Sequence, residues 1–221
     1  MSTHQNRTIK ALTEVDNLAW PEIQSLIHKS SNDVKVLSIE PIQGEQEIYK
    51  LQVTARSYLG SVGLNCGGII TNHGWLRVLG GGHKTLPSIS QASGLVDEPI
   101  GALVVGYDVT GGVFALDGGG LGFTPGNICY LSLDTLEWQD LDISHSFFVH
   151  WAIDGGNFAG FYRDFLWKGW EEDIKQLPTN YGYFWFPPPS TTAWVQNSPG
   201  KAVPLREIAA YSTGIDLSSP N

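Results

Sequence analysis

Residues 68 to 79, Gly68-Ile-Ile-Thr-Asn-His-Gly-Trp-Leu-Arg-Val-Leu79, place two short aliphatic runs on either side of a polar turn. Asn and Gly readily adopt the backbone conformations of a tight turn, so Asn72-His73-Gly74 is expected to reverse the chain. The flanking runs are rich in Ile, Val and Leu, which is typical of strands. This stretch therefore predicts an antiparallel strand pair.

The same pattern continues on both sides of this pair. Thr110-Gly111-Gly112 and Asp134-Thr135 each separate two aliphatic runs, and 18 of the 26 glycines lie between residues 60 and 126, where turns are needed. The sequence predicts an antiparallel meander in an α+β fold. Its expected strands, besides the first pair, are 34–39, 48–53, 102–107, 113–116, 128–133 and 136–141.

After residue 142 the spacing of apolar residues changes from two to about 3.6, which indicates helices. Ser144 or Ser146 is available as an N-cap for the first of them. Near the N-terminus, Pro21 is expected at the first position of another helix, with a shorter helix before it. The apolar stripes are Ile9 with Leu12; Ile23 with Leu26 and Ile27; Phe147, Phe148, Trp151 and Ala152; Phe158, Phe161, Tyr162 and Phe165; and Trp170, Ile174 and Leu177.

These elements predict one α+β domain over residues 1–221, because neither a linker nor an internal repeat interrupts the sequence. The meander is expected to pack against aromatic-rich C-terminal helices and a short N-terminal helix. Fourteen of the 25 aromatic residues lie between Phe147 and Phe186, so we expect them to form core. The expected parts are helical (1–32), strand-rich (33–142), helical (143–178) and a C-terminal extension packed on the body (179–221), with residues 218–221 frayed.

Composition excludes several classes of protein. Of 221 residues, 42% are hydrophobic and only 16% are charged, which is unlike a disordered chain. No apolar run approaches the roughly 20 residues that span a bilayer. The first residues also lack the hydrophobic stretch of a secretory signal. We therefore expect a soluble, cytoplasmic protein with no membrane partner.

The charge is unevenly distributed. Acidic residues outnumber basic ones by 22 to 13, a net charge of −9. Residues 85–162 contain nine acids and no Lys or Arg, which leaves 13 acids and 13 bases elsewhere. An acidic surface repels nucleic acid and attracts basic proteins. The segment thus predicts a basic protein partner and no nucleic-acid partner; an acidic surface that serves only solubility is the alternative.

The predicted contact face of such a binding module is acidic. Trp138 lies between Glu137 and Gln139 and is expected to be an exposed interface anchor. The predicted partner-binding residues are Asp108, Asp117, Asp134, Glu137, Trp138, Asp140 and Asp142.

The sequence lacks motifs for metal, cofactor or nucleophilic chemistry. Cys66 and Cys129 stand alone, without the paired ligands of a zinc site, and no Asp-x-Asp-x-Asp-Gly calcium loop occurs. In Leu79-Gly-Gly-Gly-His-Lys-Thr85, His83 separates the last Gly from the Lys, so the phosphate-loop pattern fails. We therefore expect no catalytic residue, no cofactor and no metal. Of the two thiols, Cys66 is expected to be the more accessible.

A ligand site in the Gly-rich segment is the second hypothesis. His73 lies in a turn and His83 in a Gly-rich loop, with Trp75 expected to be exposed nearby. Asp108 and Asp117 flank a hairpin turn, and two facing carboxylates would suit hydrolysis of a glycosidic bond. This small-molecule or carbohydrate-binding domain, or hydrolase, would use His73, Trp75 and His83. A structural protein that self-associates is a third possibility.

Several longer motifs resemble a known family. Similarity to a bacterial domain-of-unknown-function family, number 2625, is carried by Trp20-Pro-Glu-Ile-Gln, His73-Gly-Trp-Leu-Arg-Val-Leu-Gly, Gly112-Val-Phe-Ala-Leu-Asp-Gly-Gly, Leu133-Asp-Thr-Leu-Glu-Trp138 and Phe161-Tyr-Arg-Asp-Phe-Leu-Trp-Lys-Gly-Trp170. The resemblance covers nearly the whole chain. It implies no catalytic residue, because the family has no established activity.

A fainter resemblance is to the SUKH superfamily, which includes bacterial toxin-immunity proteins. Val113-Phe-Ala-Leu-Asp117-Gly followed by Ser144-His-Ser-Phe-Phe148 is similar in order, although the spacing here is longer and residues 118–120 add three glycines. This resemblance implies an α+β domain whose acidic surface blocks a basic toxin or nuclease. The leading hypothesis, which rests on the segment without Lys or Arg, is a non-enzymatic protein-binding module. The resemblance implies its narrower form, an immunity-like protein that acts against a basic toxin or nuclease.

Overall fold

The computed structural model describes residues 6–94, 101–185, 200–205 and 207–208, so the frayed end expected at residues 218–221 lies outside the described residues. The strands are β1 (Val34–Leu37), β2 (Gly68–Thr71), β3 (Leu76–Leu79), β4 (Ala102–Asp108), β5 (Val113–Asp117), β6 (Asn127–Leu131), β7 (Trp138–Ser144), β8 (Tyr181–Phe184) and β9 (Lys201–Pro204).

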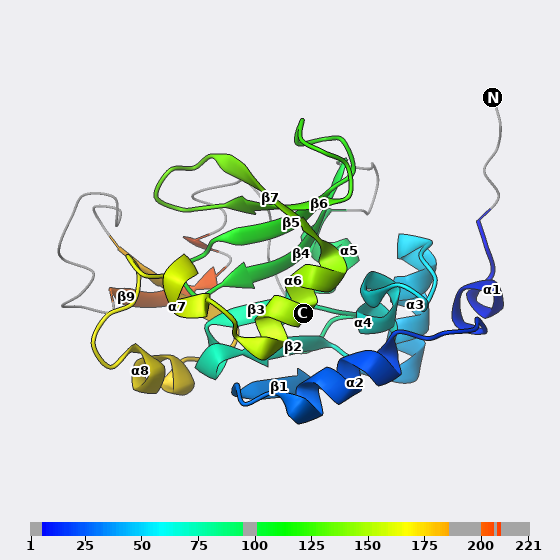
Figure 1. Ribbon diagram of the computed structural model, residues 1–221, viewed down its shortest axis with the longest axis horizontal. Coiled ribbons are helices and arrows are strands. Elements are labelled where there is room, and N and C mark those ends of the chain that lie inside the picture. Colours follow the sequence, from blue (N-terminus) through cyan, green and yellow to red (C-terminus); the bar gives the residue numbers. More distant parts are fainter. Residues whose placement is uncertain (1–5, 95–100, 186–199, 206, 209–221) are drawn as a thin grey trace.

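Strands β1 to β7 form one antiparallel sheet in which every strand pairs with the next one along the chain (Figure 1). In the pair that the sequence indicated first, Gly68 lies opposite Leu79 and Thr71 opposite Leu76, and the 3₁₀ turn η1 (Asn72–Gly74) joins β2 to β3. The predicted meander and the α+β class are confirmed. β8 and β9 form a separate two-stranded ribbon.

The helices fall largely where the apolar stripes predict them. Pro21 lies in the first turn of its helix, and the Ser144 hydroxyl accepts a 3.3 Å hydrogen bond from the Phe147 N–H, as an N-cap. The helices are α1 (Ile9–Thr13), α2 (Trp20–Lys29), α3 (Pro41–Leu51), α4 (Tyr58–Asn65), α5 (Ile89–Ala92), α6 (His145–Asp154), α7 (Phe158–Phe161) and α8 (Trp170–Gln176).

The prediction of a strand at 48–53 is wrong, because these residues form the end of helix α3 and the turn that follows it. Pro41 at the start of α3 favours a helix, and Ile48 and Leu51 lie three apart, on one helical face. Glu47, one residue earlier, is buried and accepts hydrogen bonds from the Ser90 N–H and hydroxyl, both at 2.6 Å. Tertiary contacts therefore determine the secondary structure of this segment, because its short apolar pattern fits both a strand and a helix.

Helix α4 was not expected, because its two glycines give it a low intrinsic helix propensity. Close packing of α4 against α3 explains its presence. A Cβ at Gly44 of α3 would lie 2.0 Å from the carbonyl oxygen of Leu64, so only glycine allows the two helices to approach this closely. The predicted strand-rich part at 33–142 thus contains three helices, α3, α4 and α5.

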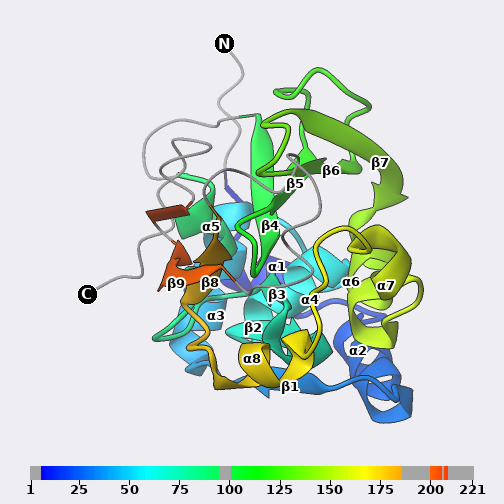
Figure 2. The same cartoon turned by 90° about the vertical axis from the view of Figure 1, so that its left-hand side faces the viewer.

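Both faces of the sheet are covered at its central strands, whereas β1 and β7 are partly exposed. Figure 2 shows α6 and α7 on one side and α5 with the β8–β9 ribbon on the other. All side chains of β2 and β3 are accordingly buried. Phe148 of α6 packs on Phe114 of β5 with ring centroids 4.8 Å apart, which confirms the expected aromatic core. Among the described helices, none combines the length and apolar character needed to cross a bilayer.

A buried histidine begins helix α6. Neither ring nitrogen of His145 has a hydrogen-bond partner among the described residues, and burial lowers its pKa to about 4. The unfolded chain has a histidine pKa of about 6.5 and therefore binds this proton more readily. The stability that comes from the neutral ring is complete above pH 6.5 and is lost as the pH falls toward 4.

We expect the free energy of unfolding to fall by about 3 kcal/mol between pH 6.5 and 4 on account of His145. Urea unfolding at a series of pH values should show this slope. A His145→Leu variant should lose this component, whereas His28→Leu, at an exposed histidine of α2, should keep it. An unchanged slope in His145→Leu would contradict the assignment.

Candidate functional site

A groove of about 950 Å³ opens between β7 and α6. Its walls are mainly apolar, and the aromatic rings of Trp151 and Phe161 meet in it with centroids 5.4 Å apart. Phe147 is 57% exposed, which is unusual for so large an apolar side chain. The apolar walls are formed by Tyr58, Leu141, Ile143, Phe147, Trp151 and Phe161.

The polar residues that line the groove give it a negative charge. Glu22 of α2 and Asp154 at the end of α6 are exposed acids, and none of the described lining residues is Lys or Arg. His150 stacks on Tyr58 with ring centroids 6.3 Å apart. Burial and the neighbouring Glu22 carboxylate together raise the pKa of the Tyr58 hydroxyl to about 12, so it remains a neutral hydrogen-bond donor.

Strand β7 and the turn before it carry several predicted contact residues, and Leu141 and Ile143 of the same strand line the groove. Glu137 and Asp142 are exposed, while Asp134 and Asp140 are half-buried. The Asp140 carboxylate accepts hydrogen bonds from the Asp142 N–H at 2.8 Å and the Asn127 side chain at 3.1 Å, which lower its pKa. The Asp140 carboxylate therefore remains charged at neutral pH.

Trp138 is less exposed than the sequence suggested. It is half-buried and packs against the core at the start of β7. Its neighbour Glu137 is exposed, so the acidic end of the strand reaches solvent while the indole is partly covered.

Asp108 does not belong to a contact face. Its side chain is fully buried, and its carboxylate accepts hydrogen bonds from five donors. Oδ1 accepts from the Thr110 N–H at 2.8 Å, the Thr110 hydroxyl at 2.6 Å and the Gly112 N–H at 3.0 Å. Oδ2 accepts from the hydroxyls of Tyr130 at 2.8 Å and Tyr162 at 3.0 Å. The carboxylate oxygens of Asp108 thus accept all their hydrogen bonds from groups inside the fold, so the prediction that Asp108 contacts a partner is corrected.

Asp117 is likewise an internal group, with a side chain only 1% exposed. It accepts hydrogen bonds from the N–H groups of Gly119, Leu121 and Phe123, at 2.6, 3.1 and 3.0 Å, and so shapes the loop after β5. It pairs with Ala102 at one end of β4, whereas Asp108 is at the other end. Six residues of strand separate the two ends by about 20 Å, so the predicted facing carboxylates do not form.

The residues of the alternative ligand site do not converge. Trp75, expected to be exposed, is fully buried in an aromatic cluster with Tyr162 and Trp170, at centroid distances of 5.2 and 5.3 Å. His83 lies in its own loop, where Nδ1 is 3.2 Å from the Thr85 hydroxyl. His73 alone lines a cavity, one to which neither Trp75 nor His83 contributes.

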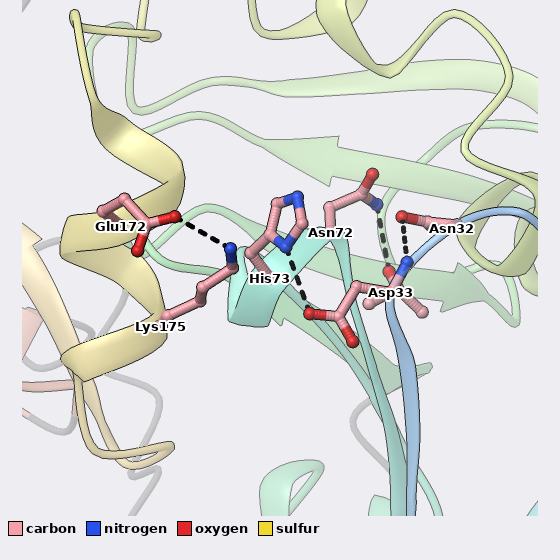
Figure 3. Close-up of polar contacts among 7 residues, drawn as sticks. Asn32, Asp33, Asn72, His73, Glu172 and Lys175 are labelled. Atoms are coloured by element: carbon pink, nitrogen blue, oxygen red, sulfur yellow. Dashed lines mark hydrogen bonds and ion pairs between the residues drawn. The ribbon is translucent and has the colours of Figure 1, made fainter.

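The cavity beside His73 is smaller, about 280 Å³, and its charged residues come from three segments of the chain. His73 Nδ1 is 3.1 Å from Asp33 Oδ2, and the His73 ring lies 5.8 Å from the ring of Trp170. Figure 3 shows His73 between Asp33 and Lys175, whose ammonium group is 3.0 Å from Glu172. The charged lining residues are Asp33, Lys35, Arg77 and Lys175.

Sequence reasoning missed most of this cavity. Asp33 and Lys175 are 142 residues apart, and neither belongs to a recognisable motif. A local signal does exist at the turn, where Asn72 and His73 both adopt left-handed backbone conformations, with φ of 51° and 61°. Non-glycine residues rarely do so, and such conformations concentrate at functional sites.

The cysteines and the Gly-rich loop have structural roles. Both thiols are fully buried, so the expectation that Cys66 is accessible is wrong. Burial raises the pKa of Cys66 to about 12 and that of Cys129 to about 11, which makes thiolate chemistry unfavourable. A Cβ at Gly81 would lie 2.4 Å from the carbonyl oxygen of Gly63, so the glycine allows this loop to pack closely against helix α4.

Within the described part of the chain, no three His, Cys, Asp or Glu side chains gather as a metal site would require. Together with the groove and the smaller cavity, the fold defines an α+β domain with two separate concave sites.

Comparison with known sequences identifies the family. Residues 9–208 match the family described as "Protein of unknown function DUF2625", and the chain belongs to this family. The Escherichia coli (strain K12) protein YbfG, described as uncharacterized, is 32% identical over 207 residues, which are 91% of this chain and 94% of YbfG. An uncharacterized protein of Haemophilus influenzae is 33% identical over 187 residues, 82% of each chain. No solved structure matches the chain.

These comparisons confirm the first of the two family resemblances. The family description and the names of the two relatives state no activity. The similarity to SUKH proteins stays a prediction.

Replacing Asp108 by Asn should destabilise the protein by about 3 kcal/mol or more, because an amide nitrogen cannot accept the hydrogen bonds of the buried donors. Chemical denaturation should detect the loss. Glu137→Gln makes the same chemical change at an exposed site and should alter stability by no more than about 0.5 kcal/mol. Equal stability of the two variants would show that the Asp108 network is unimportant.

Neither thiol should react with the disulfide reagent DTNB at pH 8 until the protein unfolds, because both are buried and protonated. Full reaction of two thiols is expected in guanidinium chloride. Cys129→Ser isolates Cys66, and rapid reaction of that variant in its native state would reinstate Cys66 as an accessible thiol.

Proposed function

We propose that the protein is a non-enzymatic binding module that takes a basic, amphipathic segment of a partner protein into the groove between β7 and α6. The observation that carries the proposal is the combination of apolar walls with Glu22 and Asp154 as the charged lining residues. An apolar groove with one sign of charge at its rim favours a segment that presents apolar side chains flanked by the opposite charge.

The apolar part of the groove supplies an anchor for such a segment. Phe147 projects from α6 toward solvent, while Trp151 and Phe161 form the wall behind it. Covering Phe147 would remove a large apolar surface from water, and aromatic side chains at the centre of an interface commonly carry much of the binding free energy.

The acids of β7 extend the negative surface beyond the groove. Asp134, Glu137, Asp140 and Asp142 follow one another along this edge of the sheet and its preceding turn. Charge of one sign raises the rate at which an oppositely charged protein is encountered. The contact face that we propose therefore keeps these four acids with Trp138, omits Asp108 and Asp117, and adds the groove.

An immunity-like role is the narrower form of this proposal. In that form the basic segment belongs to a toxin or a nuclease, whose nucleic-acid-binding surface is typically basic. The 78 residues without Lys or Arg, 85–162, support a basic partner of either kind.

A fluorescent peptide of Leu and Lys arranged with helical periodicity provides a defined probe. Fluorescence anisotropy should show binding that weakens steeply with salt, since the attraction is electrostatic. Phe147→Ser should weaken binding about tenfold. Ile42→Ser is a matched control, because Ile42 is also 57% exposed but lies on α3, away from the groove, and it should leave the affinity unchanged.

A second pair of variants tests the charge. The double variant Glu22→Lys with Asp154→Lys should abolish the salt-sensitive binding. The control, Glu40→Lys with Glu171→Lys, changes the net charge by the same amount outside the groove and should weaken the binding only slightly. Equal binding of a Leu–Glu peptide would contradict the proposal. The proposal would also be contradicted if the protein formed a dimer and Phe147→Ser abolished that dimer. Such a result would assign the groove to a second copy of the chain.

A further inference from the structure

We propose that the cavity beside His73 is a binding site for a small anion with a carboxylate or phosphate group, held by Arg77, Lys35 and Lys175. This site lies at η1, β3 and α8, apart from the groove, and it is independent of the proposed partner binding. The inference begins with Arg77, a charged side chain that is only 1% exposed.

Arg77 has few partners for a buried guanidinium, one of which is the ring of Tyr107, whose centroid lies 5.9 Å from the Arg77 Cζ. It donates to the carbonyl oxygens of Trp75 at 3.3 Å and Tyr181 at 2.9 Å, and its Nε–H has no hydrogen-bond partner among the described residues. No ion pair of the described residues includes it. Burying a cation without such compensation is costly, so an anion in the adjoining cavity would be favoured.

The nearest internal carboxylate does not supply this compensation. Asp108 lies on the strand beside Arg77 and attracts it electrostatically, but both its oxygens are occupied by the five donors described above. Burial lowers the pKa of Arg77 only to about 10, so the guanidinium stays charged at neutral pH. Arg77 is among the residues that line the cavity, and its Nε atom, which has no partner among the described residues, is buried.

The other charged residues of the cavity reinforce this preference. Lys35 and Lys175 are exposed at its rim, and Asp33 is the acid among the lining residues. Three cations against one carboxylate give the lining residues a charge of +2 with His73 neutral, in a chain whose net charge is −9. The Lys175 ammonium group is also paired with Glu172, which does not line the cavity. The Asp33 carboxylate is engaged with His73, which holds it beside the ring.

The geometry of the turn keeps these groups in place. The left-handed conformations of Asn72 and His73 and the contact of His73 with Trp170 hold the imidazole at the mouth of the cavity. A site with preset side chains loses less entropy when it binds a ligand. A volume of about 280 Å³ lies at the lower end of ligand cavities, which suits a small metabolite-sized anion.

Nuclear magnetic resonance of the arginine side chains tests this site directly. Inorganic phosphate and succinate, titrated separately into the folded protein at constant ionic strength, distinguish a phosphate from a carboxylate ligand. We expect the Arg77 Nε–Hε resonance to move saturably with at least one of them, and chloride alone to leave it in place. An Arg77 resonance that neither anion moves beyond chloride would overturn the proposal.

Lys35→Ala with Lys175→Ala should weaken the binding at least about tenfold, because two cations at the rim are removed. Lys10→Ala with Lys50→Ala removes the same charge from α1 and α3, away from the cavity, and should preserve the affinity. Equal affinities of the two double variants would show that only bulk charge attracts the anion, and would reject a specific site.

Discussion

The buried carboxylate of Asp108 joins four parts of the fold through five hydrogen bonds: the end of β4, the turn that follows it, β6 and the residue that caps the end of α7. A carboxylate can be buried only if its oxygens are fully satisfied, so these segments must be in place together. Both concave sites depend on this arrangement. Tyr162 binds Asp108 and packs on Trp75 near the smaller cavity, while the adjacent Phe161 forms a wall of the groove.

Features that depend on neighbouring residues in the sequence could be predicted from it. The meander follows from short aliphatic runs separated by Gly-rich turns, and the Ser144 cap follows from its place before an apolar stripe. The local pattern at residues 48–53 did not distinguish the end of helix α3 from a strand, because Ile48 packs on Leu12 and Ala55, which are brought to it by the tertiary fold. The burial of Asp108 could not be predicted from the sequence either, because its partners Tyr130 and Tyr162 are 22 and 54 residues away.

The groove and the smaller cavity could be predicted from the sequence only where their residues are neighbours in the chain. The acids of β7 and of the turn before it lie close together in the sequence, which could therefore indicate an acidic surface there. The groove beside them could not be inferred, because Glu22 and Tyr58 belong to helices far earlier in the chain. The smaller cavity is hidden for the same reason. Arg77 occurs in a run of strand residues, and its missing partner becomes visible only when the surrounding strands and helix are packed.

The ends of the seven-stranded sheet have a consequence for the behaviour of the protein at high concentration. An unpaired strand edge can recruit another chain, and charge or distortion on the edge prevents this. β1 is only four residues long and presents Lys35, while β7 presents Asp140 and Asp142, and the left-handed φ of 53° at Asp142 interrupts its regular edge. Protonation of the β7 carboxylates in acid would remove the repulsion between molecules, so acidic storage would favour fibrous aggregation through this edge.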